Sequence, residues 1–148
     1  MSIPVSRVHS SYRSAMADLT AETQPTWMQW VGRVFTVLPA LAFVPSGVMK
    51  VTHAAKVMEG LHDQMHVSPE AITAIGIVEL TCLVLYLVPQ TAVLGATLLT
   101  GYLGGAVMVH VLGHQPVVLP ILIGVIVWGG IWLRDPRVRA LTPLRKLP

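Results

Sequence analysis

The chain has 148 residues, of which 53% are hydrophobic and only 11% are Asp, Glu, Lys or Arg. Soluble domains contain about 25% charged residues, so this composition excludes an ordinary soluble domain, whose core needs a charged shell. The net charge of +3 comes from few groups and no aromatic-interleaved basic patch accompanies it. We therefore predict no nucleic-acid partner, and interpret the charges as orientation signals in a lipid bilayer.

Residues 1–27 form a polar tail that is too polar for a secretory signal. One helical face of this tail would be apolar and would lie near Arg7 and Arg13, as in a short helix on a membrane surface. A disordered tail is the alternative, and the sequence leaves both open. The residues of that face are Val8, Tyr12, Met16 and Leu19.

Residues 28–133 contain four apolar segments, each near the ~20 residues that cross a bilayer as a helix. Between Ala71 and Leu133 the only charged residue is Glu79. Helices are expected because backbone groups in lipid must find hydrogen-bond partners within the segment. The sequence therefore predicts a four-span transmembrane bundle, with spans at Met28–Val51, Ala71–Val88, Thr91–Leu112 and Val117–Leu133.

The connections between the segments differ in length. Pro89-Gln90 and His114-Gln115-Pro116 leave room only for tight turns. Residues 52–67 form the one sizeable loop, and its apolar residues repeat at helical spacing opposite charged ones, which predicts an amphipathic interfacial helix facing outward. The apolar set is Ala54, Val57, Met58, Leu61 and Met65, and the charged set is Lys56, Glu59 and Asp63.

The positions of Lys and Arg predict the orientation. Arg7, Arg13 and Arg33 lie toward the start of the chain, and residues 134–148 form a basic tail containing Arg134, Arg137, Arg139, Arg145 and Lys146. Four spans place both tails on one side, and the positive-inside rule makes that side cytoplasmic. The tryptophan pairs Trp27/Trp30 and Trp128/Trp132 fall at the same interface, as an aromatic belt does.

Glu79 is a carboxyl group in hydrocarbon and so a functional-site candidate. At about 1.5 Å rise per residue, Glu79, Tyr102 and Ser46 reach similar depths on their spans. Lys50 lies about one turn further out, and its flexible stem can bend inward. We predict a buried polar node of these four residues facing the bundle interior. Two alternatives stay open: a Lys50–Glu79 pair that fixes which helices touch, or a pocket or protonatable site for a lipophilic molecule.

The histidines form a second group of candidate residues, which the predicted topology places on the outer side of the membrane. His62/His66 and His110/His114 are spaced i, i+4, which is a metal-ligand spacing on a helix. No HExxH motif and no cysteine partner accompanies them. We predict no metal site, and these four histidines would be its only candidates.

Gly101 and Gly105 form a GxxxG pair on the third span. Small residues allow a neighbouring helix to approach closely. The pair predicts helix packing inside the bundle, with an interface to a second copy or another subunit as the alternative.

Catalytic motifs are missing from the sequence. It contains no glycine-rich phosphate loop and no Ser–His–Asp arrangement. Cys82 is the only cysteine, which rules out an intrachain dithiol. His110 is the only histidine well inside a span, which argues against a bis-histidine haem.

Four stretches resemble the DoxX-like family of small four-helix membrane proteins: PSGVMKV (45–51), GIVELTCLVLYLVP (76–89), GYLGGAVMVHV (101–111) and VWGGIWLRDPRVRALTPLR (127–145). The resemblance implies a location in the bacterial cytoplasmic (inner) membrane and an association with membrane redox complexes. Some relatives are subunits of a thiosulfate:quinone oxidoreductase or partner with oxidative-stress enzymes. Positions matching the family's polar pattern are Lys50, Glu79, Tyr102 and His110.

Together these patterns predict an all-α, integral membrane four-helix bundle with both termini cytoplasmic. We expect an accessory or assembly subunit of a larger, redox or energy-converting membrane complex, without catalysis of its own. Its expected partners are the lipid bilayer and other membrane subunits or further copies of the chain. The alternative is a quinone-binding subunit of an oxidoreductase, with the ligand near Glu79, Tyr102 and His110.

Overall fold

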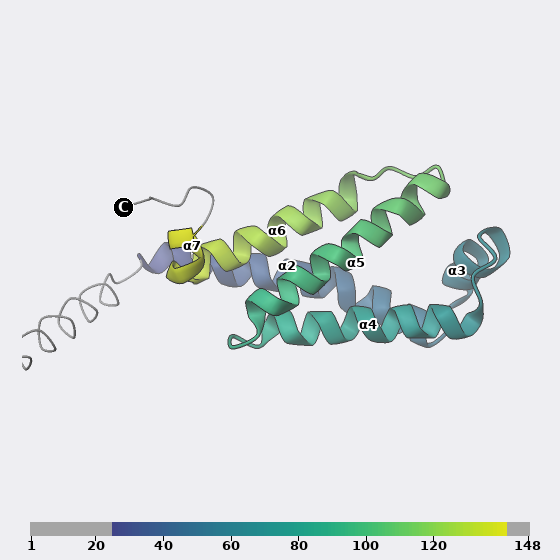
Figure 1. Cartoon of the computed structure of the whole chain (residues 1–148), viewed down its shortest axis with the longest axis horizontal. Coiled ribbons are helices and arrows are strands. Elements are labelled where there is room, and N and C mark those ends of the chain that lie inside the picture. Colours follow the sequence, from purple (N-terminus) through teal and green to yellow (C-terminus); the bar gives the residue numbers. More distant parts are fainter. Residues whose placement is uncertain (1–24, 142–148) are drawn as a thin grey trace, which may run out of the picture.

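The structure, a computed structural model, describes residues 25–141 and is all-α over that range (Figure 1). The predicted features of residues 1–24 and 142–148 lie outside the described residues. The long helices are α2 (Thr26–Val51), α4 (Pro69–Leu87), α5 (Ala92–Leu112) and α6 (Val118–Arg134), and the short ones are α3 (Ala55–Val57), η1 (Met58–Gln64) and α7 (Pro136–Leu141). The four long helices agree with the four apolar segments to within two residues at each end.

Helices α2, α4 and α5 are long and apolar enough to cross a membrane, and the 17-residue α6 is a shorter apolar helix. Apolar side chains cover the outside of the bundle, including Leu41, Val84 and Val125, each more than half exposed. A soluble protein rarely exposes so much contiguous apolar surface. The chain is a multi-pass membrane protein.

Local sequence explains where the helices begin and end. The Ser68 hydroxyl accepts a hydrogen bond from the Ala71 amide, and Pro69 occupies the first position of α4. The turn between α4 and α5 is closed by Thr91, whose hydroxyl donates to the Leu85 carbonyl oxygen at 2.8 Å. Tight turns of this kind place consecutive helices antiparallel and side by side.

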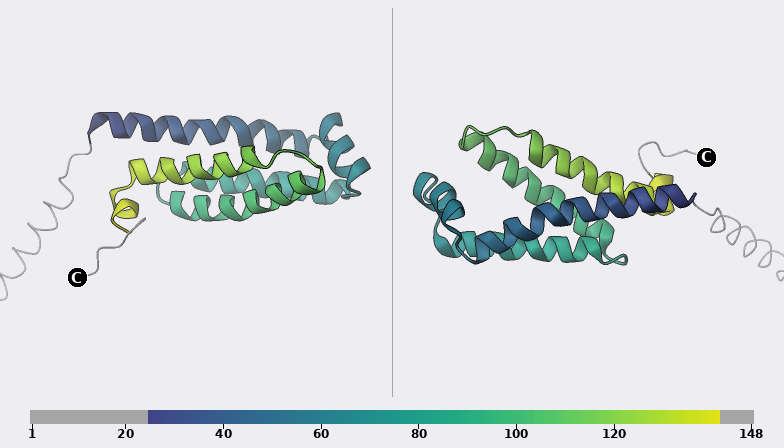
Figure 2. Two further views of the ribbon diagram at one scale, coloured as in Figure 1. Left: turned by 90° about the horizontal axis from the view of Figure 1, so that it is seen from above. Right: turned by 180° about the vertical axis from the view of Figure 1, so that it is seen from behind.

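The long helices pack in a ring in the order α2, α4, α5, α6, with α6 back against α2 (Figure 2). Glycines bring two of these pairs very close together. A Cβ on Gly47 of α2 would lie 2.6 Å from the Leu80 side chain of α4, and one on Gly95 of α5 would overlap the Tyr86 backbone. The buried core consists of Phe43, Cys82, Leu83, Tyr86, Ala92, Ala96, Leu99, Leu103, Val127 and Ile131.

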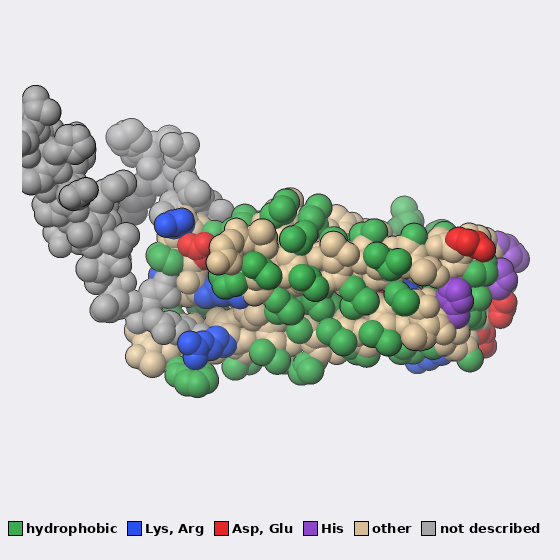
Figure 3. Space-filling view, turned by 90° about the horizontal axis from the view of Figure 1, so that it is seen from below, with side chains coloured by type: hydrophobic (Ala, Val, Ile, Leu, Met, Phe, Trp, Pro, Cys, Tyr) green, Lys and Arg blue, Asp and Glu red, His purple; other side chains and the backbone are tan. Residues whose placement is uncertain are grey.

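The two ends of the bundle differ in charge (Figure 3). We call one the arginine end: it holds the start of α2, the turn 88–91, the end of α6 and α7. The other is the histidine end, which holds residues 52–68 and 113–117. The two ends of the described chain both lie at the arginine end, and at the histidine end α5 and α6 diverge from α4 (Figures 1 and 2).

The segment between α2 and α4 covers the histidine end. It is wound as α3 followed by the π-helix η1, so its seven-residue second part has wider turns than an α-helix. Its apolar residues Val57, Met58 and Leu61 are half-buried, whereas Lys56, Glu59 and Asp63 are exposed. The amphipathic spacing of the sequence thus corresponds to a helical segment with one face toward the bundle.

Candidate functional site

The polar centre of the bundle is an ion pair between α2 and α4. The Lys50 Nζ lies 2.9 Å from the Glu79 Oε2, and the Glu79 side chain is only 1% exposed. Gly76, one turn before Glu79, lets the two helices meet here, since a Cβ on it would lie 2.8 Å from the Lys50 Cβ. Lys50 can therefore extend along α4 toward the carboxylate. The Lys50–Glu79 pair is the only salt bridge within residues 25–141.

Two hydroxyl groups complete this centre. Lys50 Nζ donates to the Ser46 Oγ at 2.6 Å, one turn earlier on α2. The Tyr102 hydroxyl, from α5, interacts with both Glu79 and Ser46, and its ring meets Phe43 edge-on at 5.9 Å between centroids. Three helices thus contribute to one cluster, and every buried side-chain nitrogen and oxygen of the described residues has a hydrogen-bond partner.

The cluster lies on the wall of a cavity of about 470 Å³. Further residues of α5 and α6 also line it, and Leu61 of η1 contributes at the histidine end. Apart from the polar cluster and His110 the lining is apolar, with Phe43 and Ile123 among the larger side chains. Small-molecule sites are commonly cavities of about 300–1,000 Å³ that are mostly apolar with a few converging polar groups, and this cavity has those properties.

His110 adds a further polar group to the same cavity. Its Nδ1 lies 2.8 Å from the Ala106 carbonyl oxygen on its own helix. Because a carbonyl can only accept, Nδ1 is the donor, and in the neutral ring Nε2 is then an acceptor. The cavity therefore combines hydroxyl groups, an ion pair and an imidazole within an apolar lining.

The structure brings together the four residues of the predicted polar node and His110, the further residue of the predicted ligand pocket. Ser46, Lys50, Glu79 and Tyr102 are in contact, and His110 lines the same cavity. Gly101 and Gly105 also line it, and a Cβ built on either meets no atom within 4 Å. These two glycines therefore widen the cavity, and no helix of the described chain packs against them.

The outer histidines do not converge. Within residues 25–141 no three His, Cys, Asp or Glu side chains are placed to hold a metal ion. His62 Nδ1 is hydrogen-bonded to the Val67 carbonyl oxygen at 2.9 Å, so this ring nitrogen already has a partner in its own segment. His66 and His114 adopt left-handed backbone conformations, with φ of 57° and 52°, just beyond the ends of η1 and α5.

Sequence reasoning missed a second, partly buried polar contact near the arginine end. Arg134 donates to the Thr36 Oγ1 at 3.1 Å and to the Tyr86 carbonyl oxygen at 3.0 Å. Its guanidinium carbon lies 5.1 Å from the centre of the Tyr86 ring. The available signal was the arginine directly at the end of an apolar segment, which the sequence explains equally well as an orientation signal.

Comparisons with known proteins give one family. No curated protein and no solved structure matches the chain significantly. The sequence profile of the DoxX-like family matches residues 34–130. The match runs from the first turns of α2 to the last turns of α6 and includes the ion pair, Tyr102 and His110. On this evidence the chain belongs to the DoxX-like family.

Proposed function

We propose that this chain is a ligand-binding subunit of a larger redox or energy-converting membrane complex, and that its cavity holds the polar head of a lipophilic molecule such as a quinone. In this arrangement α6 also crosses the membrane, and the arginine end faces the cytoplasm of a bacterial cell. The observation that carries the proposal is the position of the Lys50–Glu79 pair. It lies on the wall of a cavity of about 470 Å³ rather than sealed between packed side chains.

The chemistry of the lining supports a quinone-like ligand. A quinone carbonyl needs a hydrogen-bond donor and a quinol hydroxyl needs an acceptor. In this proposal the Tyr102 hydroxyl turns from Glu79 to the ligand and donates to a quinone carbonyl, while His110 Nε2 is an acceptor in the neutral ring. The apolar lining suits a ring and its tail. A bound quinone would supply electron-accepting chemistry, while the chain itself would bind and orient it.

The test is ligand retention by matched variants. We would purify the chain in native membrane particles and measure bound quinone by extraction and mass spectrometry. Tyr102→Phe removes the tyrosine hydroxyl that lines the cavity. Tyr86→Phe is the control, because it removes a buried hydroxyl outside the cavity that donates to the Val127 carbonyl oxygen. We expect Tyr102→Phe to retain about tenfold less quinone, as the loss of a hydrogen bond of about 1.4 kcal/mol implies, and Tyr86→Phe to retain the wild-type amount. Equal retention by both variants would contradict the ligand proposal.

The second candidate is an accessory or assembly subunit that binds no ligand. One observation favours it: Lys50 donates hydrogen bonds to both Ser46 and Glu79, so each of these buried polar groups has a partner within the chain. The pair would then serve to hold α2 against α4. The same native particles distinguish the candidates, because an assembly subunit is expected with a stoichiometric protein partner and without quinone.

A further inference from the structure

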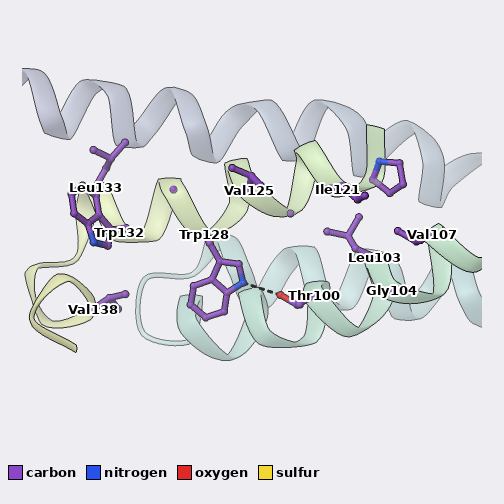
Figure 4. A pocket seen from close by; sticks show the side chains of 13 residues that line it. Thr100, Leu103, Gly104, Val107, Ile121, Val125, Trp128, Trp132, Leu133 and Val138 are labelled. Carbon is purple, nitrogen blue, oxygen red and sulfur yellow. Dashed lines mark hydrogen bonds between the residues drawn. The ribbon is translucent and has the colours of Figure 1, made fainter. Parts of the chain in front are cut away.

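A second hollow lies on the outside of the bundle, between α5 and α6. It is a groove of about 890 Å³ that is separate from the polar node (Figure 4). Its polar groups satisfy each other: Trp128 Nε1 donates to the Thr100 Oγ1 at 2.9 Å. The rest of its lining is aliphatic, aromatic or glycine, so the groove suits a hydrocarbon chain.

The groove has the length and direction of a lipid tail. Trp132 and Val138 lie at one end of it, and Ile121 and Val107 at the other (Figure 4). From Trp132 to Ile121, α6 rises about 16 Å at 1.5 Å per residue. This is close to half of the ~30 Å hydrocarbon thickness of a bilayer. A groove of that length, running along a membrane helix, matches one acyl chain of one leaflet.

Positive charge gathers where the groove meets the arginine end. Val138 lines the groove and lies between Arg137 and Arg139 in α7. The Arg139 guanidinium carbon lies 6.0 Å from the centre of the Trp132 ring, which also lines the groove. Neither arginine forms an ion pair with a carboxylate within residues 25–141. The Arg139 guanidinium donates to the Met28 Sδ at 3.5 Å, which is a weak acceptor that uses one of its five N–H groups. Within residues 25–141 the acid nearest to them in sequence is Asp135, and its Oδ1 accepts from the Arg137 backbone amide.

We propose that this groove binds an acidic phospholipid, with an acyl chain between α5 and α6 and the phosphate on Arg137 and Arg139. Apolar contact alone does not select one lipid over another in a bilayer, because every lipid tail offers the same surroundings. The headgroup therefore determines the selectivity, and guanidinium groups bind phosphate oxygens in a bidentate manner. Arg134 is excluded from this role, since its guanidinium is held by Thr36 and Tyr86 inside the bundle.

The experiment is native mass spectrometry of the full chain released from nanodiscs of equal parts phosphatidylglycerol and phosphatidylcholine. Wild type is expected to retain phosphatidylglycerol preferentially. The double variant Arg137→Gln/Arg139→Gln should lose most of that preference, by roughly fivefold for each arginine near an anionic headgroup. Arg33→Gln is the matched control, because Arg33 is an exposed arginine of α2 at the same end that does not line the groove.

A second variant tests the tail. Gly104 lines the groove, and a Cβ on it meets no atom within 4 Å, so Gly104→Leu places a larger apolar side chain in the groove. It should reduce retention of both lipids while both arginines stay in place. Equal retention of the two lipids by wild type, an unchanged preference in the double variant, or an equal loss in Arg33→Gln would each overturn the proposal. None of these outcomes depends on what the inner cavity binds.

Discussion

The polar groups near the two ends of the bundle lie in different surroundings: one set is packed between helices and the other faces a cavity. Near the arginine end, Arg134 is held by neutral oxygens of Thr36 and Tyr86, and Gly95 and Gly130 bring the surrounding helices close to Tyr86. Toward the histidine end, Lys50 and Glu79 lie on a cavity wall, and Gly101 and Gly105 face open space. The difference indicates that the first region serves helix packing, whereas the second has room for another molecule.

The largest expected loss of stability comes from variants that break the Lys50–Glu79 ion pair. Removing one partner of a buried pair typically destabilises by about 3–5 kcal/mol. Lys50→Met should approach that value, because it leaves the almost fully buried Glu79 without its cation. Glu79→Gln should destabilise less, since the Lys50 side chain is 14% exposed and can turn toward the histidine end. The midpoint temperature of thermal unfolding in detergent measures the loss of stability in both variants.

The double variant Lys50→Met/Glu79→Met removes both charges and is the control for the two single variants. It should recover most of the stability, because a hydrophobic pair of similar volume avoids burying charge. A Glu79→Gln variant that unfolds at a lower temperature than Lys50→Met would contradict this account of the pair.

A pair of glycine substitutions compares the ends directly. Gly95→Ala adds a Cβ that overlaps the Tyr86 backbone, so α4 and α5 must separate. Overpacking of this kind costs about 1–3 kcal/mol. Gly101→Ala adds the same group on the same helix in open space. It should leave the free energy of unfolding unchanged or raise it by up to about 1 kcal/mol, because alanine is a better helix former than glycine.

The same two variants also separate packing from binding. Gly101→Ala should reduce ligand retention in the cavity more than it reduces stability, since it narrows the space without disturbing a helix contact. If Gly101→Ala destabilises the chain as much as Gly95→Ala does, the open face of α5 is a packing surface and the comparison fails.

The smallest expected loss of stability is at the arginine end. Arg134→Lys keeps the charge but replaces a planar group that reaches two oxygens and stacks on Tyr86. We expect a loss of about 1 kcal/mol, equivalent to one hydrogen bond. Arg33→Lys is the control, because Arg33 is exposed and stacks only on Trp30. Chemical denaturation in detergent would measure both, and equal losses would show that Arg134 contributes only its charge.

Much of this arrangement could be predicted from residue spacing. The lone acid Glu79 in an apolar segment indicated a buried polar centre, and depth along the helices placed Ser46 and Tyr102 beside it. The cavity itself could not be predicted, because it depends on how far α5 and α6 diverge from α4. The surroundings of Gly101 could not be predicted for the same reason: a GxxxG spacing does not say whether a neighbouring helix of the same chain is present. The contact of Arg134 with Tyr86 was missed because it joins residues 48 positions apart.

The sequence by itself determined the apolar segments, the tight turns and the single acid among them, because hydrocarbon requires continuous helices and tolerates very few charges. Only the tertiary structure decided which polar groups would be sealed by packing and which would face a cavity or groove. Those outcomes depend on helix crossings and on the distance between facing surfaces, which arise when all four long helices pack together.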